Sequence, residues 1–263
     1  MKTLNYFVLF IFFFVSCNKE SEENEFINFQ NEVNQYQFKN MLQLNIERVD
    51  DSYQYPIYPG TEEWKNLKSA EEMLEACQIP AKVLTNMSTQ AIIQAILEYP
   101  QLWLVFHRYQ YQADFVFSEL NVCVELTKRK EASETILQLL KVVDPLAEGS
   151  ERISMVLELL ICQNEILAQM NNNSKKKVVK FALRNDKLRQ NHLRLSNSDE
   201  RLIASTLIGK AMVTAGYSPF WNEVKRNDEL RRFIEDKWYV YILREENAVV
   251  PGIIFFHGSK FSK

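Results

Sequence analysis

The chain has 263 residues, 46% of them hydrophobic, which is enough for one large domain or two small ones with a sizeable core. It has only six glycines and seven prolines, so a β fold with many turns is disfavoured and a mostly helical fold is predicted. The formal net charge of −3 and a pI of about 5.8 argue against a nucleic-acid-binding protein, because such domains are usually strongly basic.

The first seventeen residues have the pattern of an export signal. Lys2 supplies a positive charge, and residues 4–15 form an almost unbroken apolar run, shorter than the ~20 residues of a membrane-spanning helix. Ser16 and Cys17 follow, and the chain then turns polar. This arrangement resembles the lipobox of bacterial lipoproteins, with Phe14 where that pattern prefers leucine.

The lipobox resemblance implies that residues 1–16 are a signal peptide and that cleavage leaves Cys17 as the new N-terminus. It also implies that the Cys17 sulfur carries fatty acyl chains of the palmitate type, and more than one chain gives stable anchoring. A plain secretory signal that ends near a cysteine, or an uncleaved signal anchor, is the alternative interpretation.

The segment 17–25 is short, polar and acidic, which predicts a solvated linker after the lipid-modified cysteine. Its Lys-Glu and Glu-Glu pairs also resemble the signals that send Bacteroidetes lipoproteins to the outer face of the outer membrane. We therefore expect a lipid-anchored outer-membrane protein of the cell envelope. Whether it faces the cell surface or the periplasm stays open at this point.

Residues 26–237 are predicted to form a helical domain, because apolar residues recur there at spacings of three and four. Ser69 and Glu72 form a capping box, Pro80 suits a first helical position, and Ser88 suits an N-cap. The expected helices cover residues 26–48, 69–78, 80–87, 88–98, two or three segments of 101–142, 150–170, 175–191, 198–215 and 218–236. The Tyr- and Pro-rich residues 50–60 are a loop, and Gly216 is a left-handed helix stop.

The last segment, residues 238–263, is rich in β-branched and aromatic residues and predicts a short extended or β-hairpin-like tail. The predicted fold class is therefore mostly α, as an antiparallel helical bundle or an irregular α-α superhelix. We find no convincing repeat period in the sequence, so a degenerate solenoid is an analogy only.

Several short motifs between residues 63 and 100 resemble a recurring pattern in helical Bacteroidetes lipoproteins. They are Glu63-Trp64-Lys65-Asn66-Leu67, Gln78-Ile79-Pro80, Val83-Leu84, Met87-Ser88-Thr89 and Tyr99-Pro100. The resemblance supports the class and the location and implies no catalytic residue.

The residues that most often carry chemistry show no catalytic or metal-binding spacing. Cys77, Cys123 and Cys162 lie in apolar helical patterns and are predicted to be small buried side chains, and the three histidines are far apart. No phosphate-binding glycine loop or nucleophile elbow is present, so no cofactor and no metal is expected. Glu62-Glu63 beside Trp64 is the one place we note for a glycosidase carboxylate, and its other interpretation is the start of a helical turn.

Two clusters are candidate binding sites. The aromatic residues Tyr53, Tyr55, Tyr58 and Trp64 suit contacts with carbohydrate or protein if they are exposed, and core packing otherwise. The cations Lys175, Lys176, Lys177, Lys180 and Arg184, with Lys187, Arg189 and Arg194 beyond them, are opposed only by Asp186. They suit an anionic partner such as lipid headgroups or acidic glycan, or else they form a solvated helix face.

We expect a helical, lipid-anchored envelope protein that binds or scaffolds a glycan or protein partner and does not act on nucleic acid. The alternative is an envelope hydrolase that acts on glycan or peptidoglycan, which would need two facing carboxylates in a cleft.

Overall fold

A computed structural model describes residues 48–102, 112–147, 150–191, 198–235 and 249–263. These residues form helices joined by turns and loops, with no strand among them, so the mostly α prediction is confirmed. The signal segment, Cys17, the acidic linker and the helix expected at 26–48 lie outside the described residues. None of the described helices is both long enough and apolar enough to cross a membrane.

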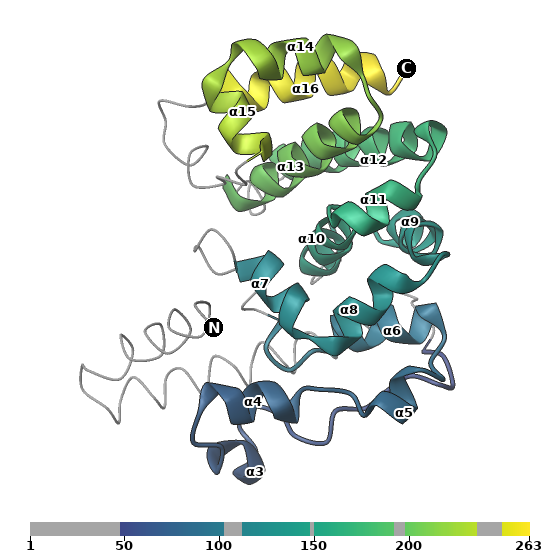
Figure 1. Ribbon diagram of the computed structural model, residues 1–263, viewed down its shortest axis with the longest axis vertical. Helices are drawn as coiled ribbons and strands as arrows, with labels where there is room; N and C mark the ends of the chain where they lie inside the picture. Colours follow the sequence, from purple (N-terminus) through teal and green to yellow (C-terminus); the bar gives the residue numbers. More distant parts are fainter. Residues whose placement is uncertain (1–47, 103–111, 148–149, 192–197, 236–248) are drawn as a thin grey trace, which may run out of the picture.

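Figure 1 shows the helices as an elongated stack, with α3 to α5 at one end and α14 to α16 at the other. In chain order the helices are α3 (Glu62–Lys65), α4 (Ala70–Ala76), α5 (Ala81–Leu84), α6 (Thr89–Leu97), α7 (Gln112–Glu119), α8 (Asn121–Lys128), α9 (Ala132–Val142), α10 (Ser150–Ile161), α11 (Asn164–Gln169), α12 (Asn172–Gln190), α13 (Ser198–Thr214), α14 (Ser218–Arg226), α15 (Asp228–Glu235) and α16 (Val249–Phe261). A single apolar core runs through the stack, from Tyr55 near its start to Phe261 at its end. This arrangement is the α-α superhelix of the two predicted architectures.

A three-helix unit recurs along the stack: a short helix, a turn, a second helix and a third helix. It is seen as α5–α6–α7, α8–α9–α10 and α11–α12–α13. Hydrogen bonds join equivalent places of consecutive units at a separation of 42 residues, from Ile79 to Asn121, from Thr89 to Glu131 and from Thr127 to Gln169. A period of about 40–47 residues with two or three helices is typical of α-solenoids.

The junction between the first two units is held by a reciprocal pair of side-chain amides. The Asn121 amide accepts from Ile79 N–H at 3.1 Å and donates to Ile79 C=O at 2.7 Å. The Gln78 amide accepts from Asn121 N–H at 2.9 Å and donates to Glu119 C=O at 3.1 Å. Loop backbone groups are thereby paired without a strand or a helix, as partly buried backbone requires.

Most predicted helix ends are confirmed, with two shifts in detail. Ser69 Oγ accepts from Glu72 N–H as predicted, but the Glu72 carboxylate accepts from Lys68 N–H, one residue before the partner that a capping box uses. Ser88 Oγ accepts from Ala91 N–H as predicted. Pro80 is the N-cap of α5 and not its first helical residue.

Gly216 ends α13 as predicted. Its φ is +68°, its N–H donates to Val213 C=O at 2.9 Å, and Tyr217 N–H donates to Met212 C=O at 3.0 Å. This 5→2 and 6→1 pairing is a Schellman motif, which needs a residue that adopts a left-handed backbone at low cost.

Two helices predicted as continuous are divided. The segment 150–170 breaks at Cys162 and Gln163 into α10 and α11. The expected turn at 171–174 is instead the start of α12, with Asn171 Oδ1 accepting from Ser174 N–H at 2.9 Å. The segment 218–236 divides at Asn227, whose Oδ1 accepts from Leu230 N–H at 3.0 Å. At Asn171 and at Asn227 an amide side chain satisfies an N–H group of a new helix, so a new axis can begin, whereas the N-cap of α11, Gln163, makes no such side-chain bond.

The prediction of an extended tail is wrong for residues 249–261, which form α16. The buried residues of this helix are Val250, Pro251, Ile254, His257, Gly258 and Phe261. Their spacing of three and four is helical, and Pro251 lies in the first turn, where its missing N–H costs nothing. β-Branched and aromatic composition misled the prediction because α16 is packed against α12, α13 and α14, and packing overrides propensity. The strand expected at 239–243 lies outside the described residues.

Candidate functional site

The exposed face of α12 carries a row of cations. Lys177, Lys180, Arg184 and Lys187 are exposed, and their spacing of three, four and three places them along one side of the helix. The opposite side, with Val178, Val179 and Ala182 among its residues, is buried in the core. We call the four exposed residues the α12 cation row.

No carboxylate neutralises the α12 cation row within the described part of the chain. None of the ion pairs among the described residues includes a member of the row. The one pair that involves α12 joins Arg189 to Glu158 and is buried. Asp186, the one acidic residue of α12, is itself buried and adds no negative charge to this face. Unpaired surface cations keep their full charge for a partner in solution or at a surface.

Two of the five predicted patch residues do not belong to this exposed row. Lys175 is only 5% exposed, and desolvation lowers the pKa of its ammonium group. Lys176 is half-buried, with Nζ 5.9 Å from the centroid of the Phe261 ring on α16. Lys177, Lys180 and Arg184 are exposed as expected, and Lys187 continues the row.

Arg189, which the sequence groups with the same basic segment, is instead buried in a polar cluster between α10 and α12. The residue is 1% exposed, with Nη2 3.0 Å from Glu158 Oε1 and 2.7 Å from Ser154 Oγ. Asn185 Nδ2 donates to the same Glu158 oxygen at 3.1 Å. Arg189 Nε has no hydrogen-bond partner among the described residues. The cluster links the third helix of one unit to the second helix of the next.

The predicted aromatic site is largely part of the core. Tyr55 is 3% exposed, its hydroxyl donates to Ala95 C=O at 3.1 Å, and its ring lies edge-on to those of Tyr53 and Tyr58. Trp64 is also buried, while Tyr53 and Tyr58 are partly buried against the core. The expectation of an exposed aromatic surface is therefore wrong for Tyr55 and Trp64, and burial raises the pKa of the Tyr55 hydroxyl.

The glutamates beside Trp64 begin a helix, which was the second interpretation of that segment. Both are exposed in the first turn of α3, and Glu62 forms an ion pair with Lys65 at 2.7 Å. Their negative charge suits the positive end of the helix dipole.

The cysteine and histidine side chains that the structure describes also lie in the core. Cys77, Cys123 and Cys162 are buried, as predicted, and none of the three forms a disulfide among the described residues. His257 is buried on α16, whereas His107 and His192 lie outside the described residues. Among the described residues no group of three His, Cys, Asp or Glu side chains is placed to hold a metal ion.

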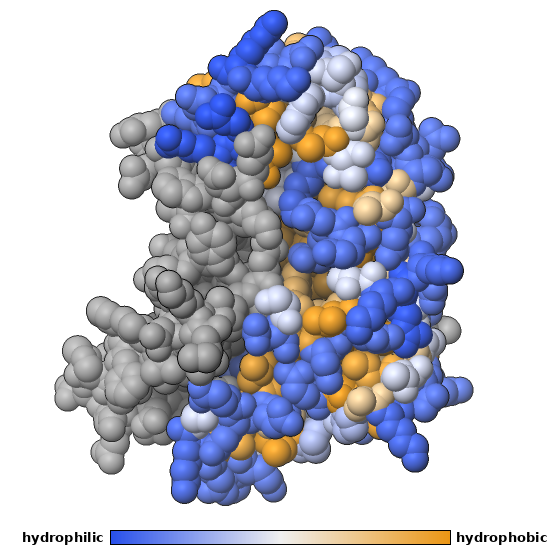
Figure 2. Space-filling view, in the orientation of Figure 1, coloured by the Kyte–Doolittle hydropathy of each residue, from blue (hydrophilic) through white to orange (hydrophobic). Residues whose placement is uncertain are grey.

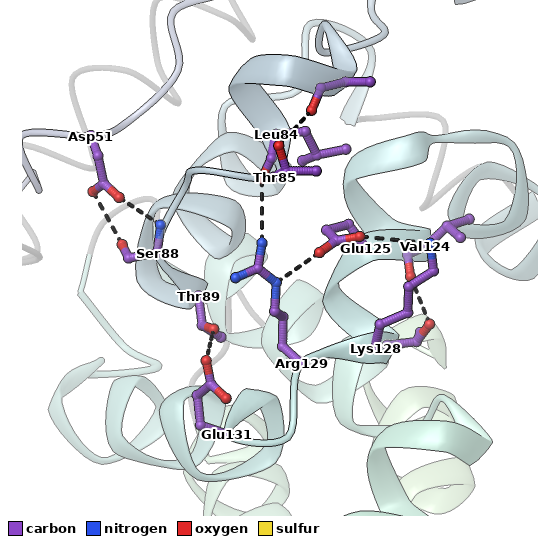
Figure 3. A network of polar contacts seen from close by, with 12 residues as sticks. Asp51, Leu84, Thr85, Ser88, Thr89, Val124, Glu125, Lys128, Arg129 and Glu131 are labelled. Atoms are coloured by element: carbon purple, nitrogen blue, oxygen red, sulfur yellow. Dashed lines mark hydrogen bonds and ion pairs between the residues drawn. The ribbon is translucent and has the colours of Figure 1, made fainter.

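Figure 3 shows a polar network, not predicted from the sequence, that connects the first units of the stack. The Asp51 carboxylate accepts from Ser88 N–H and, at 3.1 Å, from Ser88 Oγ. Thr89 Oγ1 donates to the Glu131 carboxylate, which lowers the pKa of that group. Because the two contacts start from adjacent residues, the start of α6 is tied both to the preceding loop and to the next unit.

The second half of this network is centred on Arg129. Its Nε lies 2.8 Å from Glu125 Oε1, and its Nη2 donates to Leu84 C=O at 3.3 Å. The guanidinium thus satisfies a carbonyl at the end of α5, one unit earlier. These contacts are structural, because every polar partner they use belongs to the stack itself.

A comparison with protein-family models, with curated proteins and with solved structures gives no match. The fold and the site therefore define the class of this protein: an all-α stack of three-helix units with an exposed, unpaired cation row on α12.

Proposed function

We propose that this protein is a lipid-anchored envelope protein that binds or scaffolds an anionic partner. The observation that carries the proposal is the α12 cation row: four exposed cations on one face of a rigid helix, without a carboxylate partner in the described residues. A stack of helical units presents long, continuous surfaces that suit binding more than they suit enclosure of a small substrate.

The anchor in this proposal is Cys17, on the strength of the lipobox resemblance. Residues 18–47 would connect it to the stack, and a fully extended chain of that length spans at most about 100 Å. The stack would therefore be confined to a thin layer next to the membrane, where a modest affinity for a partner is sufficient.

The anchor is tested by metabolic labelling with an alkyne analogue of palmitate. We expect label on the wild-type chain and none on Cys17→Ser, while Cys162→Ser, which changes a buried cysteine, keeps the label. Protease treatment of intact and of lysed cells then shows which side of the membrane the stack occupies. Equal labelling of Cys17→Ser and wild type would exclude this anchor.

The cation row is tested by elution from a polyanionic resin with rising salt. The double variant Lys180→Glu/Arg184→Glu should elute at clearly lower salt, because two attractive charges become repulsive. The matched control Lys65→Glu/Lys68→Glu changes the same number of exposed cationic charges at the other end of the stack and should elute near wild type. Equal losses in the two variants would mean that only net charge matters and that the α12 row is not a site.

A further inference from the structure

The outer face of α16, the last helix of the stack, is not the polar cap that the end of a solenoid normally needs. Val249 is 63% exposed and Phe256 is 55% exposed, the two most exposed large apolar side chains near this end. Lys260 lies on the same side, four residues after Phe256, and the exposed Lys263 follows the end of the helix. An outer face that combines apolar side chains with lysines is suited to contact something other than water.

Charge and aromatic character are combined closely on this face. Lys260 Nζ lies 3.9 Å from the centroid of the Phe256 ring, and α16 contains no acidic residue. Lysine beside an exposed aromatic ring is the pattern of interfacial helices, in which the ring enters the headgroup region and the ammonium group stays at the phosphates.

The α16 face adjoins the α12 cation row. The two helices pack together: a Cβ on Gly258 would lie 3.5 Å from Val179 Cγ1, and Lys176 Nζ is 5.9 Å from the Phe261 ring. As residue numbers rise on one helix they fall on the other in these two contacts, so the helices run antiparallel side by side. The side of α12 that contacts α16 is next to the side that carries Lys180 and Lys187.

The charges are also unevenly distributed along the stack. Residues 48–102 hold eight carboxylates and four cations. At the other end, α12 holds seven cations, of which Lys175 and Arg189 are buried, and a single carboxylate. Residues 198–235 hold six cations and six carboxylates, and residues 249–263 add two lysines and no acidic residue. Since Figure 1 places α3–α5 and α16 at opposite ends, the molecule has an acidic end and a basic end. Over a negatively charged surface this distribution turns α12 and α16 toward that surface.

We propose that the α16 face and the α12 cation row together dock on an anionic lipid bilayer, with Phe256 and Val249 entering the interface. The inference rests on the proposed function and names the anionic partner as the membrane surface. A second copy of the chain fits this face less well, because a two-fold contact would bring the same lysines together. A head-to-tail contact, in which the acidic end of a second copy covers this face, is also a poorer match. The glutamates of that end are interspersed with Lys65 and Lys68, and Glu62 is already paired.

The test places an environment-sensitive fluorophore on each end of the stack in the full chain. Phe256→Cys carries it on α16, and Val83→Cys carries it on α5, another exposed apolar position at the far end. Both are made with Cys17→Ser, and the remaining cysteines are buried, so labelling is confined to the new thiol. The probes are phosphatidylcholine vesicles with and without phosphatidylglycerol.

We expect a blue shift of the emission at position 256 on anionic vesicles, a much smaller shift on neutral vesicles, and none at position 83. High salt should reverse the shift, and Lys180→Glu/Arg184→Glu should weaken vesicle partition by about fivefold or more for each cation lost. Binding of the N-terminal apolar run to vesicles would not give this result. It would bring the chain to neutral and anionic vesicles alike, with no difference between positions 256 and 83.

Three results would overturn the inference. One is an emission at position 256 that is equal on neutral and anionic vesicles, and another is an equal response at position 83. The third is a shift at position 256 that needs no vesicles and rises with protein concentration, which would identify a second copy as the occupant. If the α12 variant still loses retention on the polyanionic resin, the proposed function stands and the lipid assignment alone fails; if retention is unchanged as well, both fail.

Discussion

Arg189 shows how far the role of a residue depends on its neighbours. In the sequence it is one of a run of cations, but in the fold it is buried against Glu158 and Ser154. A buried ion pair is weak evidence for stability, because desolvation of both charges offsets most of their attraction. Removing only one of the two charged residues is costly, because the remaining buried charge then has no partner.

We therefore expect Glu158→Ala to lower the free energy of unfolding by about 3–5 kcal/mol, measured by urea denaturation. The double variant Glu158→Leu/Arg189→Met, which removes both charges, should lose much less. Glu62→Ala breaks an exposed pair and serves as the control, with an expected loss below about 1 kcal/mol. A cost for Glu158→Ala as small as that of the control would show that Arg189 is hydrated in the native state.

His257 is buried on α16 against the rings of Tyr217 and Phe220, and its Nδ1 has no hydrogen-bond partner among the described residues. Desolvation lowers its pKa from the ordinary value of 6.5; nearby Glu223 acts in the opposite direction, and Lys260 lowers the pKa further. The unfolded chain therefore binds this proton more readily than the native chain does. Stability should fall as the pH drops through about 6.5, until the lowered native pKa is passed.

The measurement is the melting temperature between pH 8 and pH 5, for wild type and for His257→Gln. The difference between the two curves isolates this group from the other histidines and carboxylates. We expect the variant to lose less stability than wild type on acidification. Parallel curves would mean that His257 titrates alike in the native and unfolded chains.

At the scale of the helix, α16 offers a matched pair of glycines that differ only in their surroundings. A Cβ on Gly258 would lie 2.6 Å from Ile208 Cγ2 on α13, whereas a Cβ on Gly252 would meet nothing within 4 Å. Gly258→Ala should destabilise the protein by about 1–3 kcal/mol, because α16 must move off α13. Gly252→Ala should be neutral or stabilising by up to ~1 kcal/mol, since alanine is the better helix former.

Thermal unfolding of both alanine variants checks this pair, and the opposite sign of the two shifts is the decisive feature. If the two variants melt alike, α16 is not held closely on α13. The wrong expectation of a β tail has the same origin as this prediction: composition favours strand in residues 249–256, but close packing of a helix surface on α13 decides the conformation.

For the molecule as a whole, the uneven charge is a property of the stack and not of the composition. A net charge of −3 gives no hint of a basic end, because acidic and basic residues are separated along the axis of the stack. The 42-residue relation between units is similarly absent from the sequence as a repeat of residue types. The buried faces of the second helices share burial but not residue type: α9 buries Ile136, Leu137 and Leu140, whereas α12 buries Val178, Val179 and Ala182.

Features whose partners lie within a few residues could be predicted from the sequence. The helical class, the Ser88 cap, the Gly216 stop and the burial of the three cysteines follow from local hydrogen bonding and from periodic hydrophobicity, and the structure confirms them. Three outcomes required the tertiary structure: which cations are exposed, which aromatic rings belong to the core, and that the last segment is a helix. Those outcomes depend on contacts between segments that are 31 or more residues apart, such as Arg189 with Glu158 and Tyr55 with Ala95. A pattern of neighbouring residues contains no information about such contacts.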